Sequence, residues 1–354
     1  MTVRKGKRLM LSGFSSNVIS AKAKAMYGKR LVDSDYAEMM RKQTVSEIAG
    51  YLKNNTHFSL VLSNINENLI HRGQLENLLR RACFDRYLRL SRYQKSSGRF
   101  YYFAVLRAEI EQILLAVMHL STDAQSDIIL SIPAFLMDHA SFNLLSLATV
   151  HSFSDLLLVL DKTPYKGVLF PFIATIGADQ AVDVSACETA LFSHYYAEII
   201  ARAKKEFSGD VRAKLLRIIL MEIDLTNLCV IYRLKKYFGK KSDEIVRYLL
   251  PFHYKLTRNI LRQMLDSASP DDIVDMSQKK YKCAGTGEKV EYIDEYVRQL
   301  RYFLNKRELR FSNSAPLVLY AFMALSEIEV SNITRIIEGV RYKMNPEEIG
   351  KLII

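Results

Sequence analysis

The chain has no tryptophan, four cysteines, seven prolines and 14 glycines in 354 residues. So little proline and glycine excludes a collagen-like or low-complexity chain, and hydrophobic residues, at 49%, suffice for a large core. No proline precedes Pro133, which favours helix over a turn-rich β fold. The cysteines form no C-x-x-C pair, so we expect a reduced, cytosolic protein with buried thiols at Cys83, Cys187, Cys229 and Cys283.

Long hydrophobic runs are also missing. The longest uncharged stretches, such as residues 139–154, are shorter than the roughly 20 apolar residues that a membrane span needs, so no spanning segment is expected. No apolar core follows the first positive charges, which argues against a secretory signal. The basic, serine-containing N-terminus leaves an organelle transit peptide as an alternative.

The net charge of +12 is unevenly distributed. Residues 1–30 contain eight lysines and arginines and no acid, whereas the rest of the chain is nearly balanced. A protein that coats nucleic acid is often basic throughout, so this pattern indicates instead a near-neutral body with a basic leader.

Apolar residues recur at helical spacing. One stripe comprises Leu75, Leu78, Leu79, Ala82 and Cys83, and another comprises Ile110, Ile113, Leu114 and Met118. Alternating, strand-like patterns are scarce, and residues 167–173, which include Pro171, are interpreted as a buried loop. The sequence therefore predicts an all-α protein.

Three segments carry a capping box, in which Ser or Thr is followed three residues later by an acid: Thr44-Val-Ser-Glu47, Ser152-Phe-Ser-Asp155 and Ser269-Pro-Asp-Asp272. The hydroxyl caps free N–H groups and the acid favours the positive helix end, so each box predicts a helix start. An aromatic residue follows the apolar stretch after each box: Phe58, Tyr165 and Tyr281.

Two more elements recur in the same order. The second element is an acid, followed three positions later by a branched apolar residue and eight positions later by an aromatic residue. The three instances are Glu76/Leu79/Phe84, Glu188/Leu191/Tyr196 and Asp294/Val297/Tyr302. The third is a Glu-Ile pair that begins 33 or 34 residues later, at Glu109, Glu222 and Glu327. In this register Leu114 stands where the other copies have Asn227 and Asn332.

These repeats predict three similar helical domains of about 105–115 residues, a period too long for the common solenoids. We expect a basic N-terminal arm and helix at residues 1–43, followed by helical repeats at residues 44–138, 139–250 and 251–354.

A search for reactive chemistry finds little. The seven histidines are dispersed without metal-ligand spacing, and no G-x-S-x-G elbow presents a nucleophile. The loop Gly285-Thr-Gly-Glu-Lys289 lacks the register of a phosphate-binding loop and is interpreted as a connector. The repeated acids suit helix capping and pairing better than acid–base catalysis. The sequence predicts no catalytic, cofactor-binding or metal-binding residue, and no enzyme.

Basic residues gather after each acidic helix, in three clusters: Arg86, Arg89 and Arg92; Arg202, Lys204 and Lys205; and Lys306, Arg307 and Arg310. They can complement the negative ends of helices. Alternatively, they form three basic patches that meet an acidic partner or phosphate groups.

Three stretches resemble the C subunit of the V-type, archaeal and bacterial A/V-type, ATPases and ATP synthases, a relative of the eukaryotic d subunit. They are Asn17-Val-Ile-Ser-Ala-Lys22-Ala-Lys24-Ala-Met26, Glu222-Ile-Asp-Leu-Thr-Asn227-Leu with Arg233-Leu-Lys, and Glu327-Ile-Glu-Val-Ser-Asn332-Ile through Gly339 to Asn345-Pro-Glu-Glu-Ile349. The sequence departs from the family pattern at Ser20, at Leu114 and at Leu250-Pro-Phe-His-Tyr254.

The resemblance implies an all-helical funnel of three domains around a pseudo-threefold axis, without catalytic activity or a cofactor. It implies a rotor subunit at the cytoplasmic face of the cell membrane, between the central stalk (a coiled-coil shaft and its small companion) and the proteolipid ring. A rotor part in this position links ATP hydrolysis or synthesis to proton or sodium transport. The three basic clusters would then face acidic ring loops or lipid headgroups.

The rival hypothesis is a helical adaptor or RNA-binding scaffold with a basic surface. Aromatic residues at helical spacing do not supply the exposed stacking platform that single-strand binding uses, so we expect no nucleic-acid partner.

Overall fold

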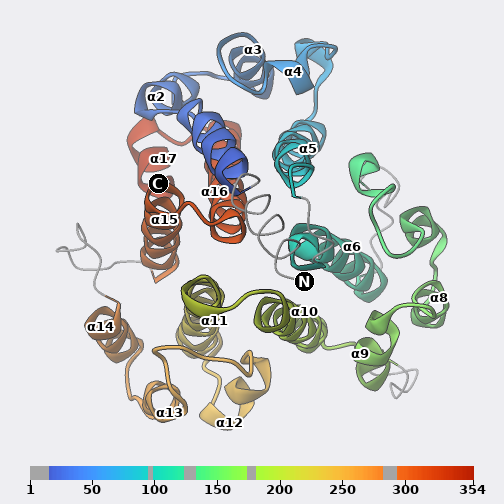
Figure 1. Cartoon of the computed structure of the whole chain (residues 1–354), viewed down its shortest axis with the longest axis vertical. Coiled ribbons are helices and arrows are strands. Elements are labelled where there is room, and N and C mark those ends of the chain that lie inside the picture. The colour runs from blue at the N-terminus through green and yellow to red at the C-terminus, as the bar shows by residue number, and fades with distance from the viewer. Residues whose placement is uncertain (1–15, 95–98, 123–132, 174–180, 282–292) are drawn as a thin grey trace, which may run out of the picture. The chain divides into compact units, whose positions relative to one another are not determined.

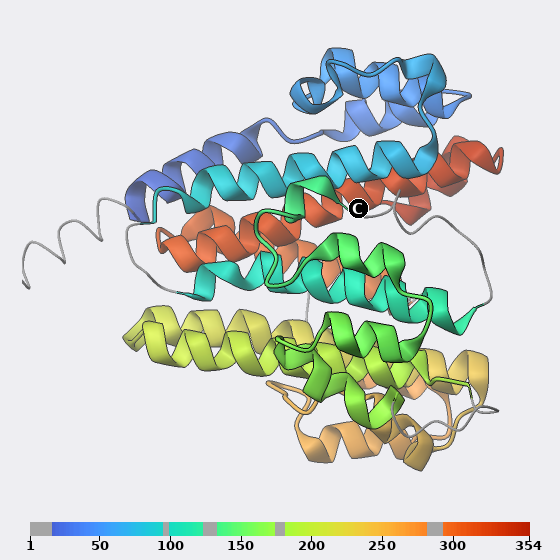
Figure 2. The ribbon, with the colours of Figure 1, turned by 90° about the vertical axis from the view of Figure 1, so that its right-hand side faces the viewer.

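The structure is a computed structural model that describes residues 16–94, 99–122, 133–173, 181–281 and 293–354 (Figure 1). Within these ranges the chain is helical and contains no β-strand, which confirms the all-α prediction (Figure 2).

Among the described residues, six long helices come in three consecutive pairs, and groups of shorter helices lie between the pairs. Residues 16–28 are helical. The long helices are α5 (Arg72–Ser91), α6 (Phe103–Ser121), α10 (Val184–Glu206), α11 (Gly209–Phe238), α15 (Ile293–Phe311) and α16 (Ala315–Arg341). The shorter helices are α2 (Asp33–Met40), α3 (Val45–Asn55), α4 (Ser59–Leu62), α8 (Phe153–Val159), α9 (Pro164–Ile173), α12 (Ser242–Ile245), α13 (Arg258–Asp266), α14 (Pro270–Lys280) and α17 (Pro346–Leu352). Short 3₁₀ turns are η1 (Glu67–Leu69), η2 (Arg99–Tyr102), η3 (Ala134–Leu136), η4 (Leu144–Thr149) and η5 (Val246–Tyr248).

The chain divides into two compact units, residues 1–98 with 298–354, and residues 99–297. In the first unit α16 runs beside α5 and also contacts α2, α3 and α17 (Figures 1 and 2). Its core joins both ends of the chain, because Met39, Leu52, Leu79, Ile333 and Ile337 are all fully buried in one apolar cluster. α16 is therefore part of the same core as the N-terminal helices α2, α3 and α5.

In the second unit α10 packs against α6, α9 and α11, and α11 contacts α12 and α14. The interpretation of residues 167–173 as a loop is wrong, because they form most of α9. Pro164 begins this helix, where a missing N–H is harmless, and Pro171 lies in its last turn. Pro171 therefore removes only a hydrogen bond near the helix end, which the helix tolerates.

All three predicted helix starts are confirmed. The hydroxyls of Thr44 and Ser152 accept hydrogen bonds from the backbone N–H groups three residues later, at 3.2 and 3.1 Å. Ser269 makes the reciprocal capping box, because its own N–H donates to the Asp272 carboxylate at 3.1 Å. These starts were predictable because a cap involves only neighbours in sequence.

The predicted stripe on α5 is confirmed, with Leu75, Leu79, Ala82 and Cys83 buried. The stripe on α6 ends earlier than predicted, since Met118 is 52% exposed. Of the cysteines that the structure describes, Cys83 and Cys187 are buried free thiols and Cys229 is half-buried. Cys283 lies outside the described residues.

Candidate functional site

Three carboxylates are buried inside the helical units: Glu109 on α6, Asp224 on α11 and Glu329 on α16. Glu109 and Asp224 are fully buried, and Glu329 is 7% exposed. A buried carboxylate is costly unless donors surround it, so the partners of these three acids show what the sites do.

Glu109 accepts hydrogen bonds from two segments that follow it in the chain. The backbone N–H of Ser141 donates to one carboxylate oxygen, and the phenol of Tyr165 donates to the other at 2.6 Å. Burial, and then the Glu109 charge, raise the pKa of Tyr165, so its phenol stays protonated and remains a donor.

Asp224 has the densest set of donors. The backbone N–H groups of Tyr254, Lys255 and Leu256 donate to its oxygens at 3.0, 2.7 and 2.9 Å. The phenol of Tyr281 donates at 2.5 Å, and burial followed by the Asp224 charge raises the pKa of Tyr281. This carboxylate therefore fixes the loop after η5 and the end of α14 onto α11.

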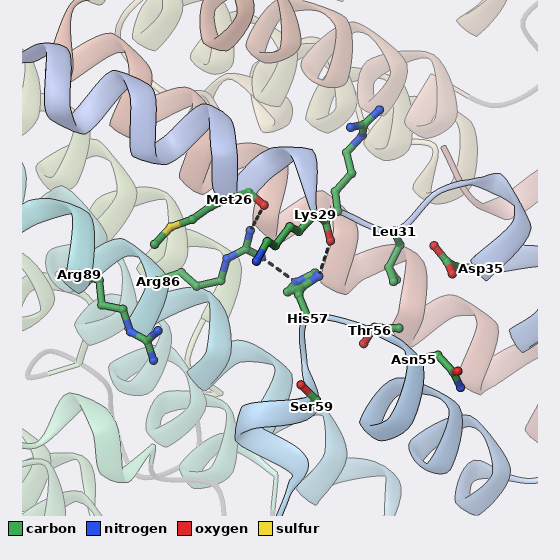
Figure 3. A pocket seen from close by; sticks show the side chains of 11 residues that line it. Met26, Lys29, Leu31, Asp35, Asn55, Thr56, His57, Ser59, Arg86 and Arg89 are labelled. Carbon is green, nitrogen blue, oxygen red and sulfur yellow. Dashed lines mark hydrogen bonds between the residues drawn. The ribbon is translucent and has the colours of Figure 1, made fainter.

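Glu329 makes the corresponding contacts with residues near the start of the chain. It accepts a hydrogen bond from the Leu31 backbone N–H at 2.7 Å. Its other oxygen lies 3.4 Å from His57 Nε2 and 3.7 Å from a guanidinium nitrogen of Arg86. Arg86 is held in turn, because it donates to the Met26 carbonyl at 2.9 Å and contacts His57 Nε2 at 2.7 Å (Figure 3).

The hydrogen bonds assign the tautomer of His57. Its Nδ1 lies 3.0 Å from the carbonyl oxygen of Lys29, which can only accept, so Nδ1 carries the proton (Figure 3). Nε2 is then the acceptor for Arg86. His57 thus links the chain before α2 to α5, beside the Glu329 carboxylate.

An asparagine follows two of these acids by three residues and makes a pair of hydrogen bonds to the backbone: Asn227 after Asp224 and Asn332 after Glu329. Asn227 donates to the Leu250 carbonyl at 3.0 Å and accepts from the Leu250 N–H at 2.8 Å. Asn332 makes the same pair of hydrogen bonds with the backbone of Ile354, at 2.7 and 3.2 Å. Each amide binds backbone about 22 residues further along the chain, which adds to the rigidity of the attachment.

Together these contacts show one arrangement three times. In each, a buried acid on a long helix accepts a hydrogen bond from a backbone N–H and lies against an aromatic side chain. The phenols of Tyr165 and Tyr281 donate to Glu109 and Asp224, whereas Glu329 lies 3.4 Å from His57 Nε2. The partners are structural donors, and the tyrosine phenols are held protonated. The arrangement fastens short helices and loops to long helices.

The structure corrects the register of the third repeated element. Glu222 and Glu327, aligned with Glu109 in the sequence, are half-buried, and the buried acids are Asp224 and Glu329 two positions later. Two residues amount to about 200° around a helix, so the two registers place different faces against the core. With the corrected register Gln112, and not Leu114, occupies the position of Asn227 and Asn332.

His57 was missed by the sequence comparison, which aligned Phe58 with Tyr165 and Tyr281. A signal for it exists in the spacing, since His57 and Tyr165 each follow their helix-capping residue, Thr44 or Ser152, by 13 positions. The distance from the capping residue would therefore have placed His57 opposite Tyr165, although one is a histidine and the other a tyrosine.

The nine predicted basic residues divide by their surroundings. Arg86 is bound within the Glu329 site, and Arg202 donates to Glu198 and to the Arg99 carbonyl at 2.7 and 2.8 Å. Lys306 is half-buried and contacts the Tyr302 hydroxyl at 3.0 Å. The remaining six are exposed: Arg89, Arg92, Lys204, Lys205, Arg307 and Arg310.

Two further observations bear on function. Among the described residues, no His, Cys, Asp and Glu side chains gather in a group that could hold a metal ion.

α16 is long and apolar enough to cross a membrane, but 67% of its apolar window is buried in the protein, as in the core helix of a soluble protein. The loop Gly285–Lys289 lies outside the described residues.

Fold and sites together define an all-α scaffold protein, in which buried carboxylates and amides fasten short helices onto long ones. The family model described as "ATP synthase (C/AC39) subunit" matches residues 19–352, so the chain belongs to this family. The C subunit of the A-type ATP synthase of Methanobrevibacter smithii is 22% identical over 335 residues, which cover 91% of this chain and 83% of that protein. The resemblance found in the sequence is thereby confirmed: the family is that of a non-catalytic subunit of a membrane-associated rotary ATP synthase complex.

Proposed function

We propose that this chain is a central-rotor subunit that connects the central stalk to the proteolipid ring, so that ATP hydrolysis or synthesis is linked to proton or sodium transport. The observation that carries the proposal is the family match across residues 19–352, nearly the whole chain. In this role the protein sits at the cytoplasmic face of the cell membrane without spanning it.

The buried carboxylates support a mechanical role. A torque-transmitting part must not yield, and close-packed cores transmit strain instead of absorbing it. Glu109 accepts two hydrogen bonds and Asp224 four, and Glu329 accepts one and lies beside His57 and Arg86, so each acid ties a loop to a long helix. Charge-assisted bonds in such surroundings are among the stronger polar contacts available to a protein.

The exposed basic residues support a contact with an acidic surface. We propose that Arg89, Arg92, Lys204, Lys205, Arg307 and Arg310 face acidic loops of the ring or anionic headgroups, at roughly 1 kcal/mol per charge near a membrane surface. Arg86, Arg202 and Lys306 have internal partners and serve the fold of their own units.

Affinity purification from native membranes tests the assignment. The tagged chain should co-purify with the proteolipid, with a coiled-coil shaft protein and with the shaft's small companion, and should show no ATP turnover alone. Tight RNA binding without membrane association would instead support the adaptor or RNA-binding scaffold.

A charge-reversal experiment tests the basic contact. Lys204→Glu with Lys205→Glu, or Arg307→Glu with Arg310→Glu, should weaken binding to the isolated ring, and the loss should shrink as salt is raised. Lys279→Glu with Lys280→Glu, at exposed positions of α14, is the matched control. Equal binding of test and control variants would refute this use of the basic residues.

A further inference from the structure

The first unit contains a hollow of about 620 Å³ beside the Glu329 site (Figure 3). It lies where the chain leaves the N-terminal helix, next to α3 and α5. Four of its lining residues are permanent cations: Lys29, Arg30, Arg86 and Arg89. Asn55, Thr56, His57 and Ser59 add polar groups to the wall.

The positive charge of this hollow exceeds the negative charge of the acids that line it or lie beside it. Asp35 is the lining acid, and its oxygens accept hydrogen bonds from the Val32 N–H at 2.8 Å and the Tyr51 hydroxyl at 2.7 Å. Glu329 lies near Arg86, but no ion pair with Lys29, Arg30 or Arg89 is found in the part of the chain that the structure describes. An excess of cations around one concave space raises the local concentration of anions.

One of these cations is already fixed in position. Arg86 is held by the Met26 carbonyl and by His57, so its guanidinium is positioned before any ligand arrives. Lys29 and Arg89 are exposed beside it. Two exposed cations next to a fixed guanidinium suit a ligand with several phosphate oxygens, because phosphate accepts charge-assisted hydrogen bonds from ammonium and guanidinium groups.

We propose that this hollow binds a phosphate-bearing polyanion, with Lys29 and Arg89 as its main contacts and the fixed Arg86 guanidinium in its wall. The ligand carries at least two phosphate groups or one phosphate on a larger headgroup. The same chemistry is offered by a soluble polyphosphate and by a phosphorylated lipid headgroup. The proposal rests on the residues of the first unit and does not depend on assembly into a rotary complex.

Binding to the purified full chain is measured with two probes. Calorimetric titration with tripolyphosphate reports a soluble ligand. Flotation with phosphatidylcholine vesicles containing phosphatidylinositol 4-phosphate reports a headgroup, and vesicles with phosphatidylserine at equal charge control for simple attraction. The test variant is Lys29→Glu with Arg89→Glu, which leaves Arg86 and the Glu329 site intact. The control is Lys279→Glu with Lys280→Glu, which changes the net charge equally.

One-to-one binding of tripolyphosphate that weakens about tenfold or more in the test variant but not in the control would support a soluble ligand. Binding confined to the phosphoinositide vesicles, with the same selective loss, would support a headgroup. The neutral variant Lys29→Gln with Arg89→Gln should show an intermediate loss, which keeps the test valid if charge reversal impairs folding. No binding at millimolar tripolyphosphate or to the vesicles, or equal loss in test and control variants, would overturn the proposal.

Discussion

Replacing Asp224 by asparagine probes whether the buried carboxylates hold the units together. One oxygen of Asp224 accepts from Lys255 N, Leu256 N and the Tyr281 phenol, and the other accepts from Tyr254 N. An asparagine keeps the size but can accept at only one of these positions. With its oxygen toward the three donors, its NH₂ group faces the Tyr254 N–H, so one part-buried donor loses its acceptor and three bonds lose their charge.

The expected cost follows from these four contacts. A buried donor left without an acceptor costs about 1–3 kcal/mol, and each charge-assisted bond that becomes neutral loses about 0.5–1 kcal/mol. Removing a fully buried charge offsets part of this loss of stability, because the desolvation penalty of the carboxylate disappears. We therefore expect Asp224→Asn to lower the free energy of unfolding by about 2–4 kcal/mol.

Two measurements check this value. Urea unfolding followed by circular dichroism gives the global change, with Asp275→Asn at an exposed position of α14 as the control, expected within about 0.5 kcal/mol of the native protein. Hydrogen exchange gives the local change, because the amides of Tyr254, Lys255 and Leu256 should lose protection before the rest of the unit does. A loss below about 0.5 kcal/mol, with these three amides still protected, would refute the reasoning.

Three more predictions concern other parts of the structure. A Cβ added to Gly339 would lie 2.5 Å from Ile349 Cγ1, so Gly339→Ala should lower the free energy of unfolding by about 1–3 kcal/mol. In a double-mutant cycle measured by urea unfolding, Ile349→Ala should cost less in the Gly339→Ala protein than in the native protein. Additive costs would contradict the contact. Burial lowers the pKa of His194, so the unfolded chain takes up a proton before the folded one as pH falls below about 6.5, and stability should fall with it. Urea unfolding at about pH 7 and 5.5 should show a smaller fall for His194→Asn than for the native protein, and an equal fall would count against this role. Burial raises the pKa of Cys187 to about 11, so at pH 8 about a thousandth of this thiol is thiolate. Iodoacetamide should therefore leave Cys187 unmodified, as measured by mass spectrometry. Labelling as fast as in the unfolded chain would contradict this protection.

The features that the sequence predicted well are local ones. The capping residues Thr44, Ser152 and Ser269 bond to N–H groups two or three positions away, so their sequence context suffices to place three helix starts. Helical periodicity likewise predicts which face of α5 is buried. These relations depend on a few neighbouring residues and the geometry of one helix.

The partners of the buried acids could not be predicted in this way, because they lie far apart in the chain. Glu329 contacts Leu31, His57 and Arg86, which precede it by more than 240 residues. Arg86, Arg89 and Arg92 share a spacing of three, yet Arg86 faces the Glu329 site while the other two are exposed. Tertiary packing decides which side of a helix contacts a neighbouring helix. The spacing of charged residues alone does not reveal that side.

The three acids also bear on how the chain is divided into units. Under the predicted division at residues 139 and 251, Glu109 and Asp224 each belong to one repeat and their donors to the next. Glu329 of the last repeat contacts Leu31 of the N-terminal arm and His57 and Arg86 of the first repeat. A unit that contains its acid and its donors would instead run from α6 to α10 or from α11 to α15. The third such unit joins α16 and α17 to the helices from α2 to α5, which are the elements that share the core of residues 1–98 and 298–354. A chain cut between α15 and α16 would leave Leu31, His57 and Arg86 without the Glu329 carboxylate that they contact, and would also remove Ile333 and Ile337 from the core that they share with Met39 and Leu79.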